Sequence, residues 1–164
     1  MWCLPASRSV AGATGWEGDW LPHFESRIRT GAQATVTRRS HDAVPVLTVD
    51  DYLPFHAIAR QLLNATSGFV SAGEVASGRE ACRVIEASEP GLVLMDVHMP
   101  DMDGIAVARW IRRRHDNVVV VLISTDEPAA LPSAAFDCGV AAVLRKQDLR
   151  PSVLVDLWRT HGPR

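Results

Sequence analysis

The sequence lacks the marks of several protein classes. Its 164 residues contain no apolar run of about 18 residues, the length that a membrane-spanning helix needs, so we expect no membrane span. The first residues show no basic start followed by an apolar stretch, so we expect no secretory signal. The three cysteines are widely spaced and odd in number, which excludes a disulfide framework. Together these absences predict a cytoplasmic protein.

The chain also has no excess of positive charge. The formal net charge is −2, which excludes nucleic-acid binding through bulk positive charge, so we expect no direct nucleic-acid binding. Lys146 is the only lysine, and the other 16 of the 17 lysine and arginine residues are arginine. We attribute that bias to GC-rich coding, which makes the position of the one lysine informative. Hydrophobic residues make up 47% of the chain, which is enough for a single buried core.

Residues 1–43 differ from the rest of the chain. They are rich in glycine, alanine, serine and threonine, they show no sustained apolar period, and they hold three of the five tryptophans. We predict a disordered N-terminal extension. Two alternatives remain: a docking segment whose aromatic side chains bury in a partner, or a true start downstream at a non-Met codon.

Residues 44–164 show the alternation of an α/β domain. Short apolar runs, typical of buried parallel strands, alternate with stretches of helical apolar spacing. The predicted strands are 45–50, 69–75, 92–95, 118–123 and 141–144, and the predicted helices are 53–64, 77–87, 104–114 and 149–160. This order predicts a doubly wound five-stranded parallel sheet with helices on both faces. Between the last two strands, Pro128 and Pro132 interrupt the pattern, so we predict only a short helix from about 131 to 138, followed by Gly139.

Polar residues follow the carboxyl ends of four predicted strands. Asp50 and Asp51 follow the first strand, Asp96 the third, Ser124 the fourth and Lys146 the fifth. In an open α/β sheet these ends meet at one edge, where ligands bind. Crowded carboxylates favour a bound cation, and an all-oxygen ligand set suits Mg²⁺. An aspartate there can act as a nucleophile toward phosphorus, with Mg²⁺ and an ammonium neutralising the oxygen charge.

Two segments carry a family resemblance. Residues 46–51, Val-Leu-Thr-Val-Asp-Asp, and residues 92–104, Leu-Val-Leu-Met-Asp-Val-His-Met-Pro-Asp-Met-Asp-Gly, resemble the receiver domain of bacterial two-component response regulators. The similarity covers roughly residues 44–161, and the spacing to Ser124 and Lys146 also matches. The resemblance implies a flavodoxin-like sheet with strand order 2-1-3-4-5 and a receiver domain over residues 44–164.

The resemblance also implies the role of each residue. Asp96 would accept a phosphoryl group from a partner histidine kinase or phosphotransfer protein. Asp50, Asp51, Asp96 and the backbone carbonyl of His98 would hold Mg²⁺. Ser124 would hydrogen-bond the phosphoryl oxygen, and Lys146 would pair with Asp96 and then with the phosphoryl group. We therefore expect a phosphoacceptor switch and not an enzyme. The switch would signal to an unknown downstream protein, and a homodimer is possible.

Other interpretations stay open. The chain ends just after the last predicted helix, so we expect a stand-alone receiver or the receiver part of a truncated transcription regulator. A phosphorylation-independent binding module on the same fold is a further alternative. A phosphatase with an aspartyl nucleophile is disfavoured, because that reaction needs a second aspartate where His98 stands.

Two details bear on switching and lifetime. Val143 occupies the position where the family commonly carries Tyr or Phe, so the coupling of Ser124 to an aromatic side chain is in doubt. His98 and Asp126 each lie two residues after a site residue. We predict that they pair and shield or orient the water that attacks the phosphoryl group. Asp101 and Asp103 are expected to be solvated loop acids.

Overall fold

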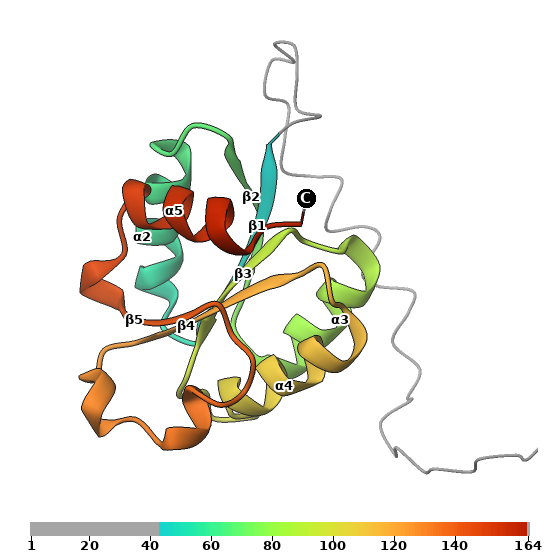
Figure 1. The fold of residues 1–164 in the computed structure, drawn as a ribbon, viewed down its shortest axis with the longest axis vertical. Helices are drawn as coiled ribbons and strands as arrows, with labels where there is room; N and C mark the ends of the chain where they lie inside the picture. Colours follow the sequence, from blue (N-terminus) through green and yellow to red (C-terminus); the bar gives the residue numbers. More distant parts are fainter. Residues whose placement is uncertain (1–42, 164) are drawn as a thin grey trace, which may run out of the picture. The chain divides into compact units, whose positions relative to one another are not determined.

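The computed structural model describes residues 43–163, which form one five-stranded parallel sheet (Figure 1). The strand order is β2-β1-β3-β4-β5, which confirms the predicted order and the doubly wound α/β architecture. The strands are β1 (Val44–Val49), β2 (Phe69–Val75), β3 (Leu92–Asp96), β4 (Val119–Ser124) and β5 (Ala142–Arg145). The predicted extension lies, apart from residue 43, outside the described residues.

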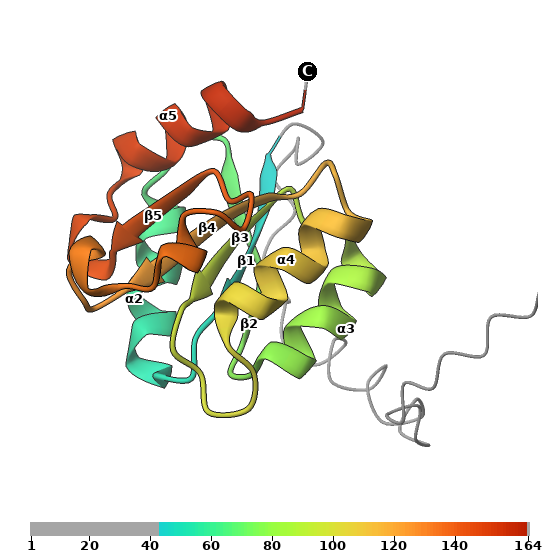
Figure 2. The same ribbon diagram turned by 60° about the horizontal axis from the view of Figure 1, so that its bottom comes forward.

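Helices cover both faces of the sheet. The helices are α2 (Leu53–Asn64), α3 (Gly78–Ser88), α4 (Gly104–Arg114) and α5 (Pro151–His161). The helices α3 and α4 lie side by side, and their buried residues pack with one face of the sheet, whereas those of α2 and α5 pack with the other face (Figure 2). Each face therefore has its own apolar cluster. Within residues 43–163, no helix is long and apolar enough to cross a membrane.

The central strands are buried along their whole length. Every residue of β3 and of β4 is buried, because helices shield both faces and neighbouring strands lie on both edges. This environment explains the continuous apolar runs of the two strands. In the parallel register Asp96 pairs with Ile123, one residue before Ser124. The ends of β3 and β4 are therefore adjacent.

Local signals fix the ends of two helices. The hydroxyl of Ser77, the N-cap residue of α3, accepts a hydrogen bond from the backbone N–H of Glu80 at 3.2 Å. Gly104 begins α4 at a point of very close approach, because a Cβ atom there would lie 1.9 Å from the carbonyl oxygen of Asp96. Only glycine fits this position, so Gly104 sets how closely α4 packs beside the end of β3.

The prediction of one short helix between β4 and β5 is wrong. The chain forms two isolated 3₁₀ turns, Pro128–Ala130 and Ser133–Ala135, instead of one helix. The cause is Pro132, which forces the preceding Leu131 into an extended conformation with ψ of 149° and so separates the turns. The stop at Gly139 is present, with φ of +80°.

Candidate functional site at the carboxyl ends of the strands

The five residues predicted to share one sheet edge do so. Asp50 and Asp51 directly follow β1, Asp96 ends β3, Ser124 ends β4, and Lys146 directly follows β5. Asp50, Asp96 and Ser124 are buried, whereas Asp51 is exposed. Buried polar groups are costly unless they are paired, so the partners of these side chains decide how the edge is held together.

Three carboxylates crowd together at this edge. One oxygen from each of Asp50, Asp51 and Asp96 lies within 4.8 Å of the other two. A single ammonium, that of Lys146, contacts this group, so the local charge remains negative. Hard oxygen ligands with uncompensated negative charge fit Mg²⁺. The residues present therefore suit the divalent cation that the sequence predicts.

Lys146 bridges two of the carboxylates. Its Nζ atom lies 2.6 Å from Asp50 Oδ2 and 3.0 Å from Asp96 Oδ1. Burial disfavours the charged form of Lys146, but the hydrogen bonds and charges of the two carboxylates outweigh it, so its pKa is raised. The ammonium therefore keeps its charge, and it links the end of β5 to the ends of β1 and β3.

Asp96 is held from two sides. Its Oδ1 faces Lys146, and its Oδ2 accepts a hydrogen bond from the backbone N–H of His98 at 3.1 Å. Burial raises the pKa of Asp96, the ammonium of Lys146 opposes that shift, and the negative charges of Asp50 and Asp51 add to it. The carboxylate is thus oriented, and cation binding beside it would relieve the repulsion that raises its pKa.

Asp50 is equally constrained. Its Oδ1 accepts a hydrogen bond from the backbone N–H of Tyr52 at 2.9 Å, and its Oδ2 faces Lys146. The backbone carbonyl of Asp50 lies 2.7 Å from Nε2 of His56. These contacts fix the turn between β1 and α2, on which Asp51 is exposed.

The loop after β4 is tied across the site. The backbone N–H of Asp126 donates to Oγ of Ser124 at 3.1 Å, and the carboxylate of Asp126 lies 3.0 Å from Nε2 of His98. The predicted His98–Asp126 pair is therefore formed, with more than half of the His98 side chain exposed. Glu127 in the same loop pairs with Arg145 at the end of β5. Val143, at the position of the missing aromatic side chain, is only partly buried.

Three residues near the site, Asp101, Asp103 and Phe55, make contacts that the sequence did not predict. Asp101 is exposed, as expected, but its carboxylate also accepts hydrogen bonds from the backbone N–H groups of Gly78 and Arg79, at 3.1 Å each. Asp103 caps α4 by accepting from the N–H of Ile105 at 2.9 Å. Phe55 lies beneath Lys146, with 4.9 Å between its ring centroid and Nζ. No local sequence pattern predicts this contact, because the two residues are far apart in the sequence.

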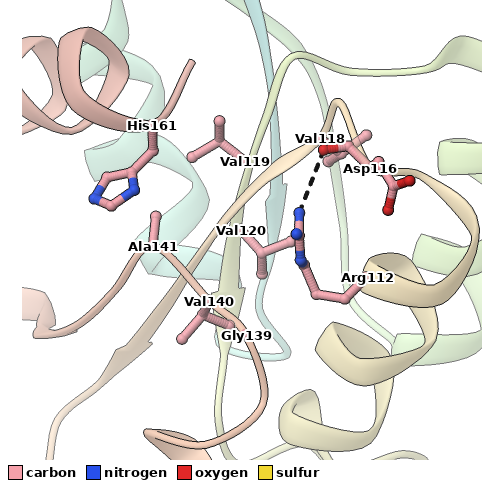
Figure 3. A pocket seen from close by; sticks show the side chains of 9 residues that line it. All are labelled: Arg112, Asp116, Val118, Val119, Val120, Gly139, Val140, Ala141 and His161. Carbon is pink, nitrogen blue, oxygen red and sulfur yellow. Dashed lines mark hydrogen bonds between the residues drawn. The ribbon is translucent and has the colours of Figure 1, made fainter. Parts of the chain in front are cut away.

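A cavity of about 210 Å³ lies elsewhere, at the amino ends of β4 and β5 (Figure 3). Arg112 and His161 lie on opposite sides of it, and Arg112 donates to the backbone carbonyl of Asp116 at 3.3 Å. None of the predicted site residues lines this cavity. The chemistry of the carboxylate edge therefore does not depend on it.

The described domain is similar to known proteins over most of its length. A family model described as "Response regulator receiver domain" matches residues 46–157. The signal receiver domain of the putative response regulator NarL from Mycobacterium tuberculosis is 31% identical, with a TM-score of 0.65, over 72% of this chain and 98% of that one.

Longer curated proteins also match. The uncharacterized transcriptional regulatory protein YhcZ of Bacillus subtilis (strain 168) is 44% identical over 92 residues, which are 55% of this chain and 42% of that protein. A protein-glutamate methylesterase/protein-glutamine glutaminase of Nocardioides sp. is 35% identical over 82 residues, 50% of this chain and 22% of the enzyme. The chain therefore spans less than half the length of these relatives.

Proposed function

Because this chain belongs to the response regulator receiver domain family, we propose that Asp96 accepts a phosphoryl group and that the resulting change is passed to a partner protein. The observation that carries the proposal is the setting of Asp96. Its carboxylate is buried at a sheet edge, oriented by Lys146 and by the N–H of His98, and adjacent to two further carboxylates.

The transfer is a displacement at phosphorus. An oxygen of Asp96 attacks the phosphorus of a phosphohistidine, the new P–O bond forms as the P–N bond breaks, and the electron pair stays on the imidazole nitrogen of the donor. Receiver domains interact with histidine kinases or phosphotransfer proteins, and one of these would supply the phosphohistidine. Lys146, already 3.0 Å from Asp96, is placed to pair with the phosphoryl oxygens.

Asp50, Asp51 and Asp96, with the backbone carbonyl of His98, would hold Mg²⁺, as receiver domains do at an acidic pocket. When bound, this ion would neutralise oxygen charge in the transition state. Ser124 supplies a hydroxyl at the end of the neighbouring strand. Its Oγ accepts from the N–H of Asp126, so its own proton is available to donate to a phosphoryl oxygen.

We further propose that His98 and Asp126 set the lifetime of the phosphorylated state. Their hydrogen bond of 3.0 Å joins the loop after β3 to the loop after β4, and both loops start at site residues. A bridge in this place restricts the approach of water to Asp96. Its side chains are half-exposed, so the effect on the rate is modest.

The output and the size of the whole protein remain predictions. The longer relatives are named as transcriptional regulators and as methylesterases, so a stand-alone receiver and the receiver part of a regulator are both retained. We keep the predictions that residues 44–164 form the domain, that they do not themselves bind nucleic acid, and that the chain works in the cytoplasm. The fifth strand lacks an aromatic side chain at Val143, so Glu127 and Arg145 are candidates to relay the state of Ser124.

The test is phosphorylation with a small acyl-phosphate donor and Mg²⁺, read by intact mass. We expect the parent to gain one phosphate and Asp96→Asn to gain none. A parent that gains no phosphate while Mg²⁺ binding is intact would favour the phosphorylation-independent binding module instead. A gain in both proteins would place the phosphoacceptor elsewhere.

A further inference from the structure

Within residues 43–163, three side chains of two kinds contact the ammonium of Lys146. Two are carboxylates, Asp50 at 2.6 Å and Asp96 at 3.0 Å. The third is the face of the Phe55 ring, whose centroid lies 4.9 Å from Nζ. This distance is within the range of about 6 Å in which a cation is attracted by the negative face of an aromatic ring. Only 13% of the Lys146 side chain is exposed, so solvent weakens the attraction little.

The three neighbours differ in what the proposed reaction does to them. Asp50 would bind the divalent cation, and Asp96 would become an acyl phosphate, so both ionic partners of Lys146 change during the cycle. The Phe55 ring takes part in neither event. Of these three contacts, it is therefore the one that can hold the ammonium in place throughout.

We propose that Phe55 is a positioning residue, which keeps the Lys146 ammonium beside Asp96 while its two carboxylate partners are engaged elsewhere. The inference rests on the proposed function, since it assigns Phe55 a task in phosphoryl transfer. Phe55 has no direct role toward the phosphoryl group or the metal ion; it acts through Lys146.

The fold holds the ring rigidly enough for this task. Phe55 is 4% exposed and belongs to the apolar cluster under α2 and α5. Its backbone N–H donates to the carbonyl of Tyr52 at 2.9 Å, in the first turn of α2, where a proline pre-forms the helix. The turn that orients Asp50 and Asp51 therefore also orients the ring.

The contact between the ring and the ammonium can be read without any reaction. Lys146 is the only lysine, so lysine labelled with ¹³C gives one set of side-chain signals. A ring face over the ammonium shifts the adjacent CH₂ signal upfield. We expect Phe55→Leu to move this signal downfield in the metal-free, unphosphorylated protein, and Phe55→Tyr to restore it. Phe69→Leu, the same change at another ring that packs against this cluster, is the control and should leave the signal in place. A Phe55→Leu signal identical to the parent's would overturn the proposal.

The functional part is tested by the rate of phosphate gain from the acyl-phosphate donor. We expect Phe55→Leu to slow it by about 3- to 30-fold, which is about 0.7–2 kcal/mol at about 1.4 kcal/mol per tenfold, and Phe69→Leu to leave it unchanged. If Phe55→Leu does not fold, fluorinated phenylalanine in the parent keeps the ring shape and weakens its negative face. The rate should then fall stepwise with each added fluorine.

The outcomes separate the two proposals. A parent that gains no phosphate refutes the proposed function, whereas the lysine signal still decides whether the Phe55 ring contacts the ammonium. If the parent is phosphorylated and neither Phe55→Leu nor fluorination changes the rate, only the positioning role is refuted. An equal slowing by Phe69→Leu would also refute it, because the effect would then belong to packing.

Discussion

Replacing Gly104 with alanine should destabilise the protein more than any other single-methyl addition in the site region. The new Cβ would lie 1.9 Å from the carbonyl oxygen of Asp96 and 3.2 Å from Cγ of Met95. A carbon and an oxygen normally approach to about 3 Å, so the start of α4 or the end of β3 must move by about 1 Å. Both segments are buried, and backbone shifts in a packed core cost about 1–3 kcal/mol or more.

The helical preference of alanine offsets part of that cost, by at most about 1 kcal/mol. Because the overlap with the Asp96 carbonyl exceeds about 1 Å, the cost lies at the upper end of that range, and we expect a net loss of about 2 kcal/mol in the free energy of unfolding, from a total of about 5–15 kcal/mol for a domain of this size. Urea unfolding followed by circular dichroism measures this. The rate of phosphorylation should also fall, because the displaced carbonyl belongs to Asp96 itself.

Gly68→Ala is the matched control. Nothing lies within 4 Å of its added Cβ, and only its φ of +83° is unfavourable for alanine. Its cost should be about 1–2 kcal/mol, from backbone strain alone, without an effect on phosphorylation. A Gly104→Ala variant that is as stable as the parent, or no worse than Gly68→Ala in both assays, would refute the close-approach argument.

Three further predictions follow from single contacts. His98→Ala and Asp126→Ala should each change the rate of dephosphorylation by up to about 5-fold. The double variant should match the single variants, because both remove the same weak, exposed pair. Unchanged rates in a phosphate-release assay would refute the lifetime proposal. Hydrogen bonding from Arg60 holds the pKa of Glu74 below its ordinary value of 4.5, so the pair's contribution to stability is present above that value and is lost as the pH falls through the lower, folded-state pKa. The stability difference between the parent and Glu74→Gln in urea should therefore disappear in acid, and a difference that grows there would contradict the pairing. Burial raises the pKa of Cys82 to about 11, so iodoacetamide should label it slowly at pH 7–8 and much faster near pH 11, as peptide mapping can show; rapid labelling at neutral pH would contradict the assigned burial.

The fold was predictable because its signals are local. Fully buried strands such as Leu92–Asp96 need continuous apolar residues, and the cap at Ser77 needs only a neighbour three residues away. The order of strands and helices follows from these signals and from the handedness of parallel connections. The one failure, between β4 and β5, arose where two prolines conflict with a helical apolar pattern, and the extended conformation of Leu131 decided against the helix.

The sequence by itself determined which residue types stand at the carboxyl ends of the strands, and therefore the set Asp50, Asp51, Asp96, Ser124 and Lys146. It determined this because in a parallel sheet the position of a residue at a strand's end sets its place on the common edge. Only the tertiary structure decided which of these groups touch, such as the bridge of Lys146 to both Asp50 and Asp96.

Other contacts between distant segments were also decided only by the tertiary structure. The hydrogen bonds of Asp101 to the start of α3 and the ring of Phe55 beneath Lys146 join residues that share no local pattern. Such contacts depend on how helices lie on the sheet and on side-chain direction, to which packing of the whole core contributes. The identity of the site residues therefore follows from the sequence. The contact of the Phe55 ring with the Lys146 ammonium depends on packing.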